Sequence, residues 1–428
     1  MQYRTWPAFL TACLLVVGEA RASGQTEKPI VLQHADSLLG LVINGEEARE
    51  LVGHVVLSQE NVLITCDQAV EFRRQGRWDL AGNVVIRDDT LTLRAPRGSY
   101  HRSERRAEAF EDVRLDDRAT TLTAAYGEYF VDERRAFFHT NVIVRDSGSV
   151  VLSDSLTYFR ETRRSISLGH VRAVSIADRV TIYGGRLDHD PVTNYDRMTI
   201  DPLLVQIDST GGGKADTLQV RGRILEAFRE GMKRLVAHDS VAMVRSDLAA
   251  RGQEACLYTE GDSLQLRTKP YLWYEESQVS GDSMNVYLKH RKLERLLVMG
   301  NTLTMSESDS LHPGRFDQMM GDRLTMQFDT SGLHRTDVEG RAISVYHLYD
   351  DSLANGLNRT SGDRIVILFA GGKAASITVY GGVEGDYFPE NMVNKREKEY
   401  ALPSFRWRTD KPEAVRVLPV HIPPLRKK

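Results

Sequence analysis

Three short segments of the chain contain residue types that could do chemistry. Gly261-Asp262-Ser263-Leu264 matches the sequence of a hydrolase block in which the serine would be the nucleophile. Asp188-His189-Asp190 groups three potential metal ligands. Gly211-Gly212-Gly213-Lys214 has the composition of a phosphate-binding loop. Each segment has to be weighed against the structural role that the same residues would have in an ordinary fold.

The serine of the first segment is better explained as a turn residue. The Gly-Asp pair before Ser263 recurs at Gly281-Asp282, Gly321-Asp322 and Gly362-Asp363, where we expect strands to begin. A catalytic serine would not be one member of a series of turns. No strand-to-helix elbow of the kind that exposes such a nucleophile follows it. The sequence therefore does not favour an esterase.

The other two segments lack the partners that their chemistry requires. Asp188-His189-Asp190 lies at a turn before Pro191, and no second cluster of ligands completes a metal site. The glycine segment at 211–214 lacks the spacing and the Ser/Thr of a phosphate loop, so we interpret it as an inserted loop. Since no other catalytic constellation is found, we expect a protein that is not an enzyme and uses no cofactor and no metal.

The N-terminal residues 1–22 have the features of a secretory signal. Arg4 supplies the positive charge, Trp6–Val17 is an apolar run too short for a membrane span, and Ala20-Arg21-Ala22 is a small-x-small cleavage site. The alternative is a lipoprotein signal with acylation of Cys13, although cleavage there would split the apolar run. Both readings predict an exported protein. Net charge of −3, 41% hydrophobic and 27% charged residues exclude a nucleic-acid binder by charge and a disordered chain.

A repeat of 29 residues between Gly53 and Leu187 dominates the chain. Each copy opens with a valine that follows a short polar or glycine-containing pair such as Gly82-Asn83. The five valines are Val55, Val84, Val113, Val142 and Val171. A fixed period of this size marks a repeat architecture.

Apolar residues two positions apart follow each of these valines, which is the pattern of a strand with one buried face. A helix would need spacings of three and four. Polar turns such as Arg73–Gly76 and Arg87–Asp89 separate the strands, so each period is predicted to hold two strands of about ten residues. The main inward positions are Val55, Leu57, Ile64, Val84, Ile86, Leu93, Val113, Leu115, Leu122, Val142, Val144 and Val151.

These patterns divide the chain into four parts. The signal peptide at 1–22 is followed by a first β-repeat domain at 23–208 and a second, irregular β-domain at 209–390. The Pro-rich tail at 391–428 is predicted to be extended or disordered. After the signal the chain has two cysteines, Cys66 and Cys256, in different repeats. A buried free thiol at Cys66 is favoured over a disulfide between the two.

The repeat phrase resembles that of a known family. Ala81-Gly82-Asn83-Val84-Val85-Ile86, followed by a strand ending near Tyr100 and then by the next such phrase, is similar to the organic-solvent-tolerance-protein-A-like (OstA-like) repeats. Gln33-His34-Ala35-Asp36-Ser37 and Thr65-Cys66-Asp67 resemble the version found in Bacteroidetes-type bacteria. Such repeats occur in periplasmic lipopolysaccharide-transport proteins and in the N-terminal domain of the outer-membrane lipopolysaccharide translocon. The resemblance implies an all-β fold, an elongated antiparallel β-jellyroll bent into a V with an apolar groove.

The resemblance also implies a function. Acyl chains of lipopolysaccharide would lie in the groove, against the twelve inward residues named above, while sugars and phosphates stay outside. Open strand edges would pair with transport proteins of the inner and outer membranes, or with a second copy, so that the protein bridges the periplasm. An adhesive or structural β-repeat protein with a closed core is the alternative, because the sequence does not tell an open groove from a self-filled one.

Overall fold

The computed structural model describes residues 30–88, 91–117, 120–208, 216–258, 261–289, 292–308, 312–350, 353–371, 373–418 and 420–423. The predicted signal at 1–22, with Cys13, and the glycine loop at 211–214 lie outside these residues. Within the described ranges, no helix has the length and apolar character that a membrane crossing requires.

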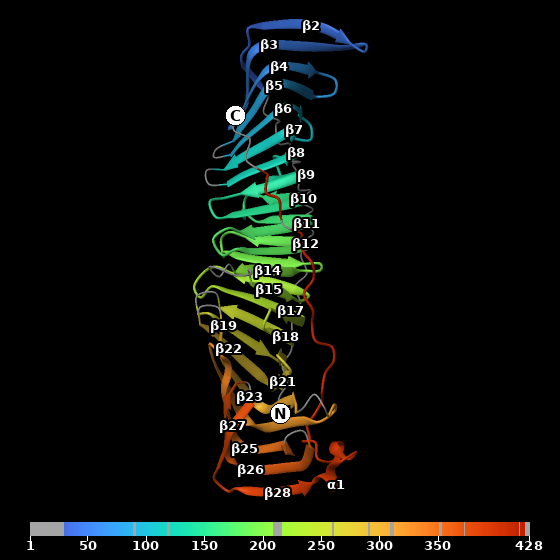
Figure 1. Ribbon diagram of the computed structural model, residues 1–428. Coiled ribbons are helices and arrows are strands. Elements are labelled where there is room, and N and C mark those ends of the chain that lie inside the picture. Colours follow the sequence, from blue (N-terminus) through green and yellow to red (C-terminus); the bar gives the residue numbers. More distant parts are fainter. Residues whose placement is uncertain are drawn as a thin grey trace, which may run out of the picture.

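The described chain forms one antiparallel sheet of 28 strands, which runs the length of the molecule. Figure 1 shows a tall stack with β2 (Ser37–Ile43) near one end and β28 (Glu384–Pro389) at the other. With about 4.8 Å between neighbouring strands, the stack is roughly 100 Å long. The prediction of an elongated, antiparallel all-β fold is confirmed.

The first half of the sheet consists mainly of long strands joined by short hairpins. Its strands are β1 (Val31–His34), β2, β3 (Glu46–Gln59), β4 (Val62–Phe72), β5 (Arg77–Asp88), β6 (Leu91–His101), β7 (Arg106–Asp117), β8 (Thr120–Phe130), β9 (Arg135–Arg145), β10 (Ser149–Phe159), β11 (Ser165–Ser175) and β12 (Val180–Asp190). From β5 to β12 each strand has 11 or 12 residues, so two strands and two turns fill one period.

Strand lengths vary more in the second half, from four residues in β20 to 19 in β25. Its elements are β13 (Tyr195–Thr199), β14 (Leu203–Asp208), β15 (Asp216–Arg221), β16 (Ile224–Phe228), β17 (Arg234–Val244), β18 (Leu248–Tyr258), β19 (Ser263–Arg267), β20 (Tyr271–Tyr274), β21 (Ser277–Ser280), β22 (Ser283–Lys289), β23 (Lys292–Glu307), β24 (Phe316–Asp329), β25 (Gly332–Asp350), β26 (Leu353–Ala370), β27 (Lys373–Tyr380), β28 and the short helix α1 (Glu390–Val393). A single 3₁₀ turn follows at Glu397–Glu399.

Alternate strands bend at a corner made of two consecutive residues with positive φ. In β5 these are Gly82 (φ 72°) and Asn83 (φ 45°). The corner inserts one extra residue relative to both neighbouring strands, which makes it a β-bulge, and bulges bend a strand. The bend divides the sheet into two arms. Arm A contains the half-strands on the side of Arg77–Ala81 of β5, and arm B contains those on the side of Val84–Asp88.

The same corner recurs along the whole stack. It lies at Gly53-His54, Gly82-Asn83, Glu111-Asp112, Thr140-Asn141, Gly169-His170, Ile200-Asp201, Asp239-Ser240, Thr268-Lys269, Gly300-Asn301, Gly340-Arg341 and Gly381-Gly382. Beyond Gly169 the spacing becomes irregular because arms lengthen, as in the 19 residues of β25. β14 pairs with β15 across the predicted boundary at 208–209, so one continuous sheet joins the two predicted domains.

Two of the Gly-Asp pairs that were predicted to begin strands lie inside strands instead. Gly321-Asp322 is in β24 and Gly362-Asp363 is in β26, each beside the corner of the next strand. Gly281-Asp282 joins β21 to β22 at the same kind of position. Gly261-Asp262 differs, because it belongs to the hairpin before β19. The sequence argument had grouped two different structural features into one series.

Glycine is required at a corner where an aspartate of the preceding strand covers it. A Cβ on Gly82 would lie 2.4 Å from Oδ2 of Asp67. Asn83 Nδ2 donates a hydrogen bond to the same oxygen at 2.8 Å. At the corner of β9, the preceding strand carries Ala125 in place of the aspartate, and Thr140 occupies the glycine position. The glycine and aspartate columns of the repeat therefore vary together.

The valine that follows each corner fills the apex between the arms. Val55, Val84, Val113, Val142 and Val171 are each at most 1% exposed. Two clusters of buried side chains surround the first four and extend from β3 to β10. A third cluster continues from Val171 to Ile367. The interior of the described chain is thus largely packed by its own side chains.

The tail after β28 returns along the outer face of arm B, in red in Figure 1. The sequence predicts an extended or disordered tail. In the structure, residues 391–418 and 420–423 are extended after the 3₁₀ turn and contact the sheet. Side chains of the sheet bind the tail's main chain, and this binding replaces the strand pairing that its prolines hinder.

Candidate functional site

The two arms enclose a cavity of about 950 Å³ in the middle of the stack. This volume is at the upper end of the range for small-molecule sites in proteins. Strands from β6 to β22 contribute to its lining. Its walls are mainly aliphatic and include Leu115, Leu122, Val144, Val151, Leu156, Ile182, Leu187 and Leu218. Such a surface stabilises hydrocarbon by removing it from water.

Four of the twelve inward residues named from the sequence lie on the cavity wall. They are Leu115, Leu122, Val144 and Val151. The other eight are packed in the interior. Of these, Val55, Leu57, Ile64 and Val84 belong to one buried cluster, Leu93, Val113 and Val142 belong to the next, and Ile86 packs against both. These eight side chains pack within or against the buried clusters.

Sequence reasoning missed much of the wall because it comes from strands beyond the regular repeat. Examples are Met198 in β13, Leu225 in β16 and Leu257 in β18. A partial signal for them was present, since Leu225 and Ala227 lie two positions apart with the polar Glu226 between them, as inward residues of a strand can. Aligning the second half on its corners, rather than on a fixed period, would have placed these residues on the inward face.

Polar contacts between the arm tips close the stack on the N-terminal side of the cavity. Tyr100 at the tip of arm A is 4% exposed. Its hydroxyl donates to Oε1 of Gln59 at the tip of arm B, at 2.5 Å. Arg160 of arm A forms an ion pair with Asp88 of arm B in the same way. These bridges tie strands that are far apart in the sequence and set the separation of the arms.

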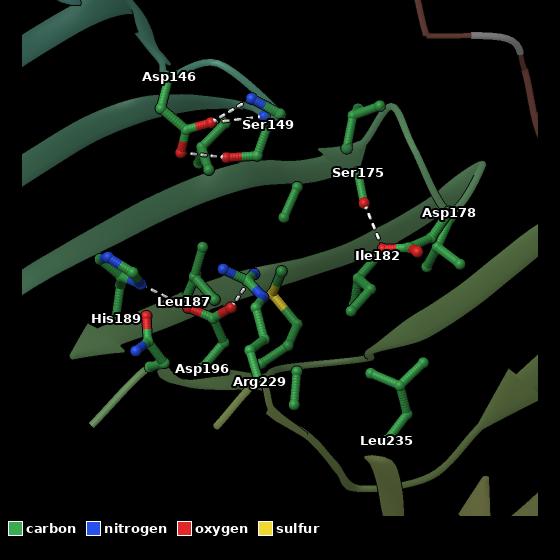
Figure 2. A pocket seen from close by; sticks show the side chains of 18 of the residues that line it. Asp146, Ser149, Ser175, Asp178, Ile182, Leu187, His189, Asp196, Arg229 and Leu235 are labelled. Atoms are coloured by element: carbon green, nitrogen blue, oxygen red, sulfur yellow. Dashed lines mark hydrogen bonds and ion pairs between the residues drawn. The ribbon is translucent and has the colours of Figure 1, made fainter. Parts of the chain in front are cut away.

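At the cavity, tip residues of both arms form a polar mouth (Figure 2). On arm B, Oδ1 of Asp146 accepts the N–H of Ser149 at 2.6 Å. On arm A, Oδ1 of Asp196 accepts a hydrogen bond from Nδ1 of His189 at 2.6 Å. Asp196 also forms an ion pair with Arg229. Burial acts to raise the pKa of Asp146, but hydrogen bonds from Ser149 and the charge of Arg229 lower it below its ordinary value. The mouth therefore carries charged groups that are already hydrogen-bonded.

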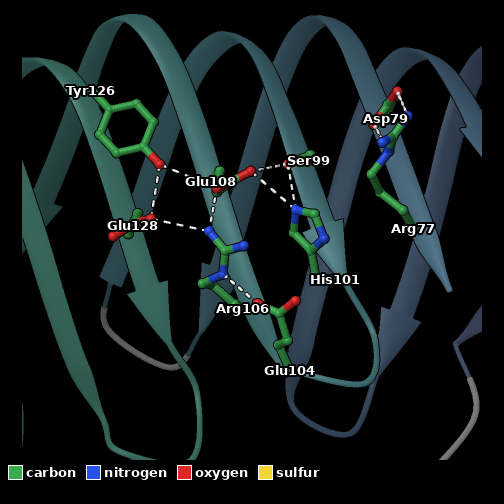
Figure 3. A network of polar contacts seen from close by, with 9 residues as sticks. All are labelled: Arg77, Asp79, Ser99, His101, Glu104, Arg106, Glu108, Tyr126 and Glu128. Carbon is green, nitrogen blue, oxygen red and sulfur yellow. Dashed lines mark hydrogen bonds and ion pairs between the residues drawn. The ribbon is translucent and has the colours of Figure 1, made fainter. Parts of the chain in front are cut away.

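A cluster on the outer face of arm A has the composition of a catalytic triad without its geometry (Figure 3). His101 Nε2 lies 3.3 Å from Ser99 Oγ and 3.1 Å from Glu108 Oε2. Ser99 Oγ also donates directly to Glu108 at 2.6 Å. A triad needs one ring nitrogen for the nucleophile and the other for the carboxylate. Here one nitrogen faces both, so the cluster is a structural network.

The two described segments that could do chemistry, at 188–190 and 261–264, have ordinary structural roles. Asp188 binds Arg186 at 2.7 Å, and Asp190 binds Arg164 at 2.6 Å. Ser263 starts β19 and pairs in the ladder with strands on both sides. Across the ranges that the structure describes, no three His, Cys, Asp or Glu side chains gather as a metal site would require.

Both cysteines of the described chain are free and buried. Burial raises the pKa of the Cys66 thiol to about 11, so the thiolate that would react is scarce at neutral pH. This matches the free thiol favoured by the sequence over a disulfide with Cys256.

Fold and cavity together define an all-β protein with a largely aliphatic cavity between its two arms. Residues 27–139 match the family model of OstA-like proteins. The family resemblance inferred from the repeats is thereby confirmed, and this part of the chain is OstA-like. No curated protein matches the sequence. The corners continue to Gly381-Gly382, so the same architecture extends well beyond the matched residues.

Proposed function

We propose that the chain is a periplasmic transport protein that shields the acyl chains of lipopolysaccharide in the cavity between its arms. The observation that carries this proposal is an aliphatic cavity of about 950 Å³ in a chain whose N-terminal part is OstA-like. Each methylene removed from water contributes about 0.8 kcal/mol. Sugars and phosphates would remain at the polar mouth. The task needs no bond making, cofactor or metal, so we propose that the protein is not an enzyme.

The ends of the stack support a role as a bridge between membranes. β2 at one end and β28 at the other are edge strands with exposed apolar side chains. Examples are Val42, which is 72% exposed, and Tyr387, which is 54% exposed. Open edges of this kind accept a further strand. We propose that they pair with lipopolysaccharide-transport proteins of the inner and outer membranes, or with a second copy. Export would depend on the signal predicted at 1–22.

The burial of the apical valines favours one alternative. Val55, Val84 and Val113 are at most 1% exposed, as in a closed core. A structural or adhesive β-repeat protein would need only this packing, and the cavity would then be a space without a ligand.

Photocrosslinking separates the two candidates. A photoreactive residue at position 144 faces the cavity, whereas one at position 143 lies on the opposite face of the same strand. We expect lipopolysaccharide to crosslink at 144 in living cells but not at 143, and not at the packed position 84. Absence of crosslinks at 144, together with no lipid in mass spectra of the purified protein, would favour the closed-core alternative.

A further inference from the structure

The last part of the tail forms a strap across the strands of arm B (Figure 1). We define the strap as residues 401–423, of which all but 419 are described. It begins where Leu402 N donates to Oε1 of Gln318 in β24, at 2.9 Å. It reaches β9, where Arg145 donates to the carbonyl of Pro423. The strap therefore lies outside the cavity and behind the arm B wall.

Buried glutamines of the sheet hold the main chain of the strap. Gln278, 2% exposed, donates to the carbonyl of Arg408 at 2.7 Å and accepts its N–H at 3.0 Å. Gln219, 7% exposed, makes the same two bonds with Val415, both at 2.8 Å. A carboxamide used in this way offers the donor and acceptor of a neighbouring strand. The sheet thus recognises the backbone of the strap.

The two halves of the strap are held with different strength. In the half near β24, Leu402 is 2% exposed, and Phe405 and Trp407 pack on the buried cluster beneath them. Beyond residue 410 only Pro412 is buried, whereas Val415 is 37% exposed and Leu418 is 76% exposed. The distal half is held mainly by hydrogen bonds. A segment with few buried apolar contacts opens at low free energy.

Contacts of the distal half lie directly behind the cavity wall. Gln219 binds the strap, and its neighbour Leu218 lines the cavity. Tyr183 donates to the carbonyl of Leu418 at 3.4 Å, and the neighbouring Ile182 lines the cavity. In β9, Arg145 binds the strap and its neighbour Val144 lines the cavity. Because neighbouring residues of a strand face opposite sides, the strap braces the outer face of the same strands whose inner face forms the wall.

We propose that residues 410–418 and 420–423 form a latch that regulates access to the cavity. Docked, the latch braces the arm B wall; detached, it lets this wall move away from arm A and admit an acyl chain. The inference rests on the proposed function, because it assumes that the cavity takes up hydrocarbon. A cavity of about 950 Å³ is the size of a site for one small molecule, so we infer that uptake of a lipid with several acyl chains requires the arms to move apart. Once the latch leaves, water can hydrogen-bond to the amide of Gln219, so the free energy of detachment stays low.

Val415 offers a test with a matched control in the full chain. Val415→Pro removes the N–H that Gln219 accepts, whereas Val415→Ala keeps it. Limited trypsin cleavage after Arg416 measures detachment, and uptake of fluorescent dodecanoic acid measures access. We expect Val415→Pro to raise both rates roughly fivefold, the effect of losing about one hydrogen bond. Val415→Ala should match the wild type.

The outcomes distinguish the two proposals. If the wild type takes up no probe, the proposed function fails, while the cleavage rates still report whether the latch detaches. If Val415→Pro is cleaved faster but takes up the probe no faster than the wild type, the latch does not control access and the inference is overturned. It is equally overturned if both Val415→Pro and Gln219→Leu leave cleavage after Arg416 as slow as in the wild type.

Discussion

Single residues at the corners decide which side chains the fold accepts. Gly82 has a φ of 72° and lies under Asp67, so a methyl group there meets both backbone strain and a contact at 2.4 Å. We expect Gly82→Ala to destabilise the protein by about 2 kcal/mol or more, measured by urea unfolding. Thr140→Ala is the control, because Thr140 has a similar φ of 67° and already carries a Cβ.

A double variant separates the two causes. In Asp67→Ala/Gly82→Ala the close contact is removed while the positive φ remains, so we expect part of the lost stability to return. Equal costs for Gly82→Ala and Thr140→Ala would show that the aspartate does not select glycine at this corner.

The lowered pKa of Glu108 predicts how the stability of the fold depends on pH. Burial acts to raise its pKa, but hydrogen bonds from Ser99 and His101 and the charge of Arg106 lower it to about 2 from an ordinary 4.5. The folded state therefore prefers the carboxylate. Its contribution to stability is complete above pH 4.5 and is lost as the pH falls towards 2. We expect Glu108→Gln to be less stable than the wild type at pH 7, with a smaller loss of stability between pH 4.5 and 2.

Urea unfolding at several pH values measures this effect. Glu104→Gln is the matched control, since Glu104 also binds Arg106 but its side chain is 56% exposed. A pH profile of Glu108→Gln that is parallel to the wild type would contradict the assignment.

At the scale of strands, the apex and the wall of the interior should tolerate change differently. Val113 is 0% exposed at the apex, whereas Val144 lines the cavity. An aspartate at the apex has no polar partner, so we expect Val113→Asp to cost about 3 kcal/mol or more. Val144→Asp faces the cavity, so we expect it to remain folded but to lose bound lipid. Thermal unfolding and mass spectrometry of co-purified lipid measure the two effects, and unfolding of both variants would contradict the distinction.

The strands of the first half were predictable because their pattern is local. A corner, an apical valine and alternating inward residues recur within every 29 residues, from Val55 to Val171. The second half keeps the corner but varies the arms, so a fixed period no longer finds it. Corner pairs such as Gly300-Asn301 still carry the signal.

The strap could not be predicted, because its contacts join residues far apart in the sequence. Gln219 and Val415 are 196 residues apart, and Gln278 and Arg408 are 130 apart. The sequence of one strand in arm B does indicate that something covers its outer face. Tyr271-Leu272-Trp273-Tyr274 is apolar throughout, which is typical of a strand buried on both faces.

For the whole molecule, the sequence identifies the inward columns but not the space between them. Leu57 and Val144 occupy the same column of the repeat, yet Leu57 is 1% exposed in a packed cluster and Val144 lines the cavity. We attribute the difference to the separation of the arms. Bridges such as Tyr100 to Gln59 set it between strands distant in the chain. No local pattern encodes such a distance.

The open edges of the sheet predict that copies of the protein associate. β2 pairs with β3 on one side, and Leu39 and Val42 in it are 48% and 72% exposed. Charges on an edge strand oppose pairing with another chain, because they would have to be desolvated in the new ladder. We expect the full chain to self-associate with rising concentration in sedimentation experiments, and Leu39→Lys/Val42→Lys to shift it to the monomer. Val192→Lys, at a 69% exposed position in a hairpin away from both edges, should leave association unchanged. If both variants associate like the wild type, end-to-end strand pairing does not join copies of this protein.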